Sequence, residues 1–163
     1  MAENLGALTI HARTRKEMSS VPARWEHVRE VVEIRDRMGL RTPIIGNGDL
    51  RDLDDAKGKI SMSHADGAML GRAIFGNPWL FDSTKKSVGI KEKLEAMVEH
   101  TKLFEELLGG KKNFALMKKH YKAYVNGFDG AKELRMKLMD EAEDASDVSA
   151  IVENFLAQSV NLL

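Results

Sequence analysis

Two short turns carry the residue types that bind phosphate. Residues 47–49 read Asn-Gly-Asp and directly follow the apolar run 42–46, whereas residues 71–72 read Gly-Arg and follow the run 65–70. A turn that contains glycine leaves its backbone N–H groups accessible to an anion, because no Cβ blocks the approach. A guanidinium binds a phosphate group with two hydrogen bonds. The two turns therefore predict a phosphate site.

The elements that must position these turns are three apolar runs that alternate with helical patterns. The predicted strands are residues 7–10, 42–46 and 65–70, and the predicted helices are residues 22–38 and 52–59, with a helical turn at 73–75. This order, with short connections, favours a parallel sheet with crossover helices. Consecutive parallel strands place their ends side by side, so both turns are expected at one edge of the sheet.

Each turn has a simpler interpretation when it is taken alone. Asn-Gly-Asp is a common structural turn, and a Gly-Arg pair is less specific still. Their order on adjacent strands changes the balance, because a phosphate site made by the loops after strands seven and eight recurs in (β/α)₈ barrels. The spacing of the turns fits that arrangement, and phosphate binding is the preferred interpretation.

A polar stretch at residues 82–89 separates this pattern from an entirely helical one. Predicted helices cover residues 94–108, 113–125, 131–143 and 146–156, the last with Ser146 as its N-cap. We therefore predict two domains, residues 1–82 and residues 90–163.

Charge is balanced over the whole chain but unevenly distributed in its second half. Basic and acidic residues number 25 each. Residues 111–137 contain eight basic and two acidic side chains, a net charge of +6, whereas the six acidic residues from Asp140 onward have no basic counterpart. The basic segment is either a solvated helix face or a surface for phosphate contacts.

The composition also excludes several classes of site. The chain has no cysteine, which rules out disulfides, thiolate metal sites and a cysteine nucleophile or acid within it. No signal-peptide pattern opens the sequence, and no apolar run approaches the roughly 18 residues of a membrane span. A cytoplasmic protein with no metal site and no membrane partner is expected.

Four stretches resemble, in order and spacing, the second half of the barrel of tRNA-dihydrouridine synthases. They are residues 8–15 (LTIHARTR), 43–50 (PIIGNGDL), 65–73 (ADGAMLGRA) and 76–81 (GNPWLF). Residues 117–121 (MKKHY) and 127–135 (GFDGAKELR) resemble the carboxy-terminal RNA-binding bundle of the same family. The resemblance covers nearly the whole chain. It implies a partial (β/α)₈ TIM barrel, strands six to eight, followed by an all-α helical bundle.

The resemblance also implies FMN as the cofactor and roles for individual residues. The implied contacts are His11, Asn47, Gly48, Asp49, Gly71 and Arg72 for the cofactor, and Arg13, Arg15, Lys118, Lys119 and Arg135 for the substrate and tRNA. His11 would lie against the flavin ring, although by itself it would be interpreted as a buried histidine bonded to backbone groups. Ala12 replaces a glycine that is frequent in the family, a harmless change if its φ is negative.

Two functional residues of the family have no counterpart here. In the family, a cysteine from the first half of the barrel donates the proton to the uracil ring, and a lysine of strand five contacts flavin and substrate. No catalytic residue is therefore expected in this chain, and strands one to five are missing from it. A complete barrel needs about 250 residues, more than the 163 present.

A three-stranded parallel sheet predicts a partner, because it leaves two open edges and exposes an apolar face. The expected partner is the missing amino-terminal half of the barrel or a second copy of the chain. A truncated or split gene, an internal start, a separate subunit and a half-barrel that dimerises all remain open.

The function implied by the resemblance is that of an FMN-dependent tRNA-dihydrouridine synthase, which reduces uridine to 5,6-dihydrouridine in tRNA with NADPH or NADH. This chain would be its carboxy-terminal portion. The alternative is a non-catalytic tRNA- or phosphate-binding module, or a subunit of a split enzyme, because the cysteine is absent. A third hypothesis gives the flavin site a small-molecule substrate, and the basic helical extension argues against it.

Overall fold

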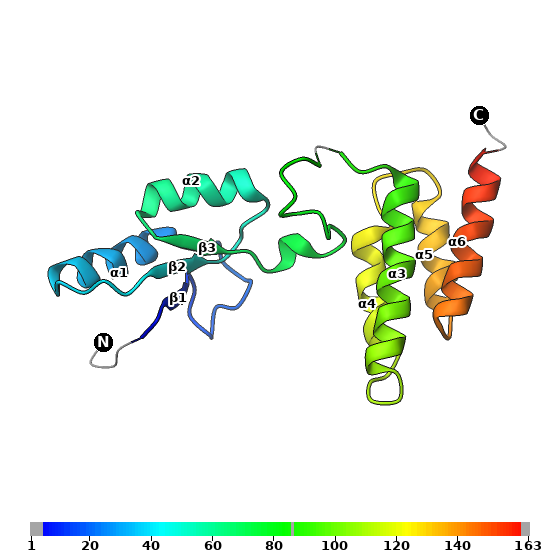
Figure 1. Cartoon of the computed structure of the whole chain (residues 1–163), viewed down its shortest axis with the longest axis horizontal. Helices are drawn as coiled ribbons and strands as arrows, with labels where there is room; N and C mark the ends of the chain where they lie inside the picture. The colour runs from blue at the N-terminus through cyan, green and yellow to red at the C-terminus, as the bar shows by residue number, and fades with distance from the viewer. Residues whose placement is uncertain (1–4, 86, 161–163) are drawn as a thin grey trace. The chain divides into compact units, whose positions relative to one another are not determined.

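The computed structural model describes residues 5–85 and 87–160 of the chain. Its contacts divide the chain into two compact units, Met1–Ile74 and Phe75–Leu163. Each unit has its own hydrophobic core, and Figure 1 shows the elements that build them. Within the described residues, none of the helices has the length and apolar character that crossing a membrane requires.

The first unit is a three-stranded parallel sheet with crossover helices, as the sequence predicts. Its elements are β1 (Leu8–His11), α1 (Trp25–Arg37), β2 (Ile44–Asn47), α2 (Leu53–Ser63), β3 (Gly67–Met69) and the 3₁₀ turn η1 (Arg72–Ile74). The strands lie in the order β1-β2-β3, and all pairs are parallel. The sheet agrees with a portion of a barrel, and its assignment to strands six to eight stays a prediction.

Within the described residues of the first unit, helices cover one face of this sheet. Ile44 and Gly46 are buried and pair in register with Leu8 and Ile10, which pack on the core that α1 and α2 complete. Successive side chains of a strand point to opposite faces. The other face therefore carries His11, Asn47 and Met69, which are aligned across the carboxyl ends of the three strands.

The first helix begins later than the sequence pattern suggests. The prediction placed Pro22 near its start, but α1 begins at Trp25. The backbone N–H of Arg24 instead donates to the carbonyl of Ala12, over 2.8 Å. The segment before α1 is thus tied to the end of β1, where it forms one wall of the site described below.

The second unit is a bundle of four helices. They are α3 (Ile90–Leu108), α4 (Ala115–Tyr124), α5 (Ala131–Asp140) and α6 (Ala145–Val160). Each helix contacts two others, and the four lie side by side in Figure 1. Their core contains Leu94, Met117, Leu138 and Val148, each fully buried.

Two details of the second unit differ from the sequence prediction. Helix α6 is capped by Asp144 and not by Ser146, because the Asp144 carboxylate accepts the N–H of Asp147 at 2.9 Å. Contacts also group residues 75–82 with the helices. In that segment Gly76 lies so close to α4 that a Cβ would be 2.1 Å from the carbonyl oxygen of Ala123. The limits and roles of the two predicted domains stay a prediction.

Candidate functional site

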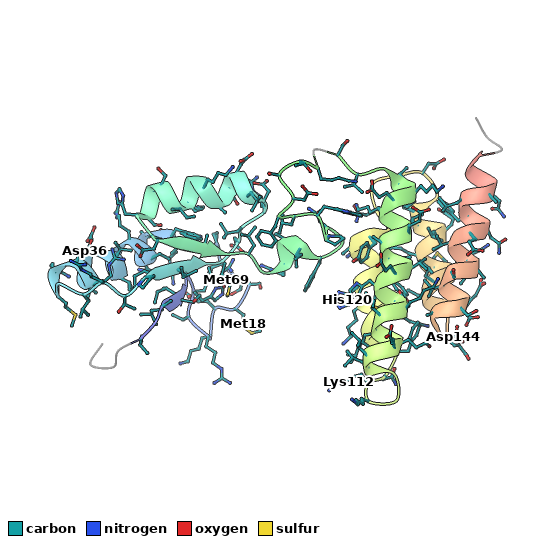
Figure 2. All side chains as sticks on the ribbon, viewed as in Figure 1. Met18, Asp36, Met69, Lys112, His120 and Asp144 are labelled. Atoms are coloured by element: carbon teal, nitrogen blue, oxygen red, sulfur yellow. The ribbon has the colours of Figure 1, made fainter. Side chains whose placement is uncertain are left out.

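A pocket of about 490 Å³ opens at the carboxyl ends of the three strands in the first unit. Its walls are formed by His11, Arg13, Thr14, Arg15, Met18, Ser19, Asn47, Gly48, Asp49, Leu50, Met69, Gly71 and Arg72. The structure therefore brings together every residue of this unit that the sequence predicts for the site. Met18 and Met69, labelled in Figure 2, supply apolar surface to the same pocket.

The turn after β2 has an unusual backbone. Gly48 has φ of +130° and Asp49 has φ of +52°, values that glycine tolerates readily and other residues rarely adopt. A Cβ at Gly48 would lie 2.8 Å from the Cβ of Ala23. A side chain at position 48 is excluded for both reasons, so the turn requires its glycine.

Trp25 supports this turn from the core of the first unit. Its indole is buried, and Nε1–H donates to the carbonyl of Gly48 at 2.9 Å. Gly46 makes room for the ring, because a Cβ there would lie 2.3 Å from Cζ3 of Trp25. Trp25 is thus a core residue that also bonds to the turn, a role that no local sequence pattern indicates.

The carboxylate of Asp49 is the centre of the polar contacts. It accepts hydrogen bonds from the guanidinium of Arg13, from the N–H of Ala23 at 2.9 Å, and from Arg72 at 3.2 Å. Hydrogen bonding from Arg13 is the main cause that lowers the pKa of Asp49, and the bond from Ala23 adds to it, whereas partial burial opposes the shift. The carboxylate is held ionised by these partners.

The two arginines on Asp49 differ in exposure. The Arg13 side chain is 5% exposed, and its Nε also donates to the carbonyl of Val21. The Arg72 side chain is 67% exposed. Gly71 beside it borders open space, since a Cβ there would meet no atom within 4 Å. Arg13 therefore links Asp49 to the loop at Val21, whereas Arg72 is accessible in the pocket.

Backbone donors are available at both turns. Among the described residues, the N–H groups of Asp49 and Gly71 donate no hydrogen bond within the chain, whereas the parallel pairing of Asn47 with Met69 directs the N–H of Gly48 to the carbonyl of Met69. The start of α2 does not contribute in the same way, because the Asp52 carboxylate caps it by accepting the N–H of Asp55 at 2.8 Å. The donors for an anion thus come from the turns themselves.

His11 and Asn47 form the row nearest the open face. The ring of His11 is exposed, and Nδ1 lies 3.3 Å from the carbonyl oxygen of Asn47. A buried histidine, the alternative considered for this position, is therefore wrong. The Asn47 amide donates to the carbonyl of Met69 at 2.6 Å and so connects the ends of β2 and β3.

The loop between β1 and α1 completes the pocket with Thr14 and Arg15. The carboxylate of Glu17 holds this loop by accepting from both the N–H and the hydroxyl of Thr14. These bonds, with one from Arg24, lower the pKa of Glu17 to about 2. Ala12, which precedes the loop, is buried and has no positive φ, so its Cβ causes no strain.

This donor set fits a phosphate group at one end of the pocket. Free N–H groups from two turns and the exposed Arg72 guanidinium are groups that bind phosphate. The negative charge of Asp49 is offset by Arg13 and Arg72, and Arg15 adds a further positive charge. The row of His11, Asn47 and Met69 provides a mixed polar and apolar surface beside it.

In the second unit, the predicted RNA contacts fall into two kinds. The Lys118 ammonium donates to the carbonyl of Met139 at 2.8 Å, and Arg135 donates to the carbonyl of Val125 at 2.6 Å. Both side chains thus bind the ends of helices. Lys119 is exposed, as are Lys112, labelled in Figure 2, and Lys122. Within the described residues, these three lysines form no ion pair or side-chain hydrogen bond.

Comparison with known proteins gives one consistent result. The family model described as Dihydrouridine synthase (Dus) matches residues 1–161. A "Probable tRNA-dihydrouridine synthase" of Staphylococcus aureus (strain MRSA252) is 34% identical over 157 residues, 96% of this chain and 48% of that protein. A "Probable tRNA-dihydrouridine synthase 2" of Bacillus subtilis (strain 168) is 33% identical over 95% of this chain and 48% of that protein. The chain spans about half the length of these relatives.

Proposed function

Because the chain belongs to the dihydrouridine synthase family, we propose that it supplies the phosphate end of an FMN site in an enzyme that reduces uridine to 5,6-dihydrouridine in tRNA. The observation that carries the proposal is the pocket in which His11, the turn at residues 47–49 and Arg72 meet. Its donors suit a phosphate, and a wider, partly apolar surface adjoins them.

In this proposal the two turns and Arg72 bind the FMN phosphate, and His11 contacts the flavin ring. The donors are the N–H groups of Asp49 and Gly71 together with the Arg72 guanidinium, while the Asn47 amide keeps the two strand ends together. When bound, the flavin supplies hydride transfer to the base, with NADPH or NADH as reductant. Arg15 lines the pocket and is proposed to contact the substrate, whereas Arg13 acts through Asp49.

The sheet is proposed to be strands six to eight of a (β/α)₈ barrel, completed by a partner. The uncovered face, with His11, Asn47 and Met69, would then face the barrel interior, whereas α1 and α2 would lie on the outside of the barrel. The partner is either a chain that corresponds to the other half of the relatives or a second copy of this chain. Both would cover the open edges at β1 and β3.

The helical unit is proposed to bind tRNA through the exposed lysines of α4 and the connection before it. Lys119 stays in this role, and Lys112 and Lys122 join it because all three are exposed. Lys118 and Arg135 are better explained as structural, since each donates to a helix-end carbonyl. Exposed lysines favour nonspecific contacts with phosphates.

One observation favours a second candidate function. The chain has no cysteine, so it contains no counterpart of the proton donor that the family resemblance implies. A non-catalytic tRNA- or phosphate-binding module is the alternative. Flavin-dependent dihydrouridine formation in tRNA by the purified chain would contradict it, and formation only after the other half of a relative is added would support the split-enzyme form of the proposal.

The substitution Arg72→Ala tests the phosphate assignment. It removes a charge-assisted hydrogen bond to the phosphate, and we expect FMN binding to weaken by about 2 kcal/mol, roughly 30-fold in Kd. Quenching of flavin fluorescence measures the affinity, with the wild-type chain and with the completing half present. Arg29→Ala is the matched control, because Arg29 lies on α1 and pairs with Glu33.

The FMN affinities of the two variants decide whether Arg72 binds the phosphate. An Arg29→Ala variant that binds FMN like the wild type, beside a weakened Arg72→Ala variant, supports the phosphate site. Equal affinity of both variants and the wild type would overturn the assignment of Arg72 to the phosphate.

A further inference from the structure

Asp49 stands in a pocket whose other groups suit an anion. A carboxylate in direct contact with a phosphate would repel it, since both are negatively charged at neutral pH. The observed contacts of Asp49 are instead with donors of the chain: Arg13, Arg72 and the N–H of Ala23. The carboxylate therefore acts on these donors and not on the anion itself.

We infer that Asp49 is a positioning residue, which holds the Arg72 guanidinium toward the phosphate through its carboxylate and is itself anchored by Arg13 and Ala23. The inference rests on the proposed function for the identity of the ligand. The geometry of the anchor does not depend on that identity. The two polar groups of Asp49 therefore have different roles. The backbone N–H is free to bind the anion, whereas the carboxylate is already bonded to donors of the chain.

The anchor side of this arrangement is rigid. Arg13 is 5% exposed and donates both to Val21 and to Asp49. The positive φ of Asp49 directs its side chain, and Trp25 and Ala23 fix the turn on either side. A carboxylate in this position has little freedom to move.

The other partner of the carboxylate, the guanidinium of Arg72, is exposed to solvent. Arg72 is 67% exposed, and a free arginine side chain loses considerable rotamer entropy when it is fixed on a ligand. Its bond of 3.2 Å to Oδ1 of Asp49 limits that freedom before a ligand binds. Asp49 also lies between two guanidiniums that would otherwise repel each other. Preorganisation of this kind raises affinity by lowering the cost of ordering.

A double-mutant cycle on the full chain, with the completing half present as in the Arg72→Ala assay, tests the inference. Asp49→Asn keeps the shape of the side chain but removes its charge, and we expect about tenfold weaker FMN binding. In the Arg72→Ala background the same substitution should have almost no further effect, because the residue through which it acts is gone. Riboflavin, which lacks the phosphate, should bind Asp49→Asn and wild type equally. Asp54→Asn, on the outer side of α2 with a 91% exposed side chain, is the matched control.

Three results would overturn the inference. Stronger FMN binding by Asp49→Asn would mean that the carboxylate repels the phosphate directly. Equal loss of FMN and riboflavin affinity would mean that the substitution only damages the fold. Additive effects of Asp49→Asn and Arg72→Ala on the free energy of FMN binding would show that Asp49 does not act through Arg72.

A second measurement needs no ligand. Guanidinium ¹⁵N NMR of the unliganded chain should show slowed rotation for Arg13 and Arg72 in the wild type, and loss of both effects in Asp49→Asn. If the wild type with the completing half present binds neither FMN nor riboflavin, the proposed function fails, and this spectrum alone decides the positioning role. Unchanged spectra of both arginines in Asp49→Asn would refute it.

Discussion

Replacing Trp25 by alanine should destabilise the first unit by about 3–5 kcal/mol, the usual loss for a buried aromatic ring. The ring is 1% exposed and fills the space left by Gly46. Its removal leaves a cavity under β2 and deprives the Gly48 carbonyl of the indole donor. Because whole domains are stable by about 5–15 kcal/mol, we expect backbone amides of β1, β2 and α1 to lose most of their protection in hydrogen exchange.

Two further variants separate packing from hydrogen bonding. Trp25→Phe keeps most of the ring volume and removes Nε1–H, so it should cost less stability than Trp25→Ala and still loosen the turn at residues 47–49. Trp79→Ala, in the second unit, is the control for loss of a tryptophan and should leave exchange in β1 and β2 unchanged. Wild-type exchange rates in β2 of Trp25→Ala would show that the indole does not hold the turn.

Replacing Lys112, Lys119 and Lys122 together by alanine should weaken tRNA binding by up to about 3 kcal/mol, roughly 100-fold in Kd, if each exposed charge contributes up to about 1 kcal/mol. The slope of log K against log salt should become shallower by roughly 2 to 3, because about three phosphate contacts are lost. Filter binding or fluorescence anisotropy over a range of salt concentrations measures both quantities. Circular dichroism should remain that of the wild type, because none of the three side chains is buried.

The matched control removes three other lysines. Lys57, Lys91 and Lys102 are exposed on α2 and α3, and their replacement changes the net charge by the same amount. It should reduce tRNA affinity far less if the surface around α4 is the RNA contact. Equal losses for the two triple variants would reduce the proposal to a nonspecific effect of net charge. Lys118→Ala and Arg135→Ala test the structural explanation, since each should lower the stability of the bundle.

The sequence by itself determined the strands of the first unit and the residues that line its pocket. The apolar runs that became β1, β2 and β3, and the Asn-Gly-Asp and Gly-Arg turns after them, are local patterns, and burial and turn chemistry act on neighbours in the chain. Parallel pairing then followed from the alternation of strands and helices, because short crossover connections permit little else. All eight predicted residues of the first unit accordingly line one pocket.

Only the tertiary structure decided what each side chain does there. Asp49 meets Arg13 and Ala23 from 36 and 26 residues earlier, and Arg72 from 23 residues later. No local pattern encodes such pairs, because they depend on how the loop before α1 folds over the strand ends. The same reason separates Lys118 and Arg135, which hold distant helix ends, from Lys119, which remains free for a ligand. Residue types follow from the sequence, and the contacts that assign their roles arise when distant segments pack together.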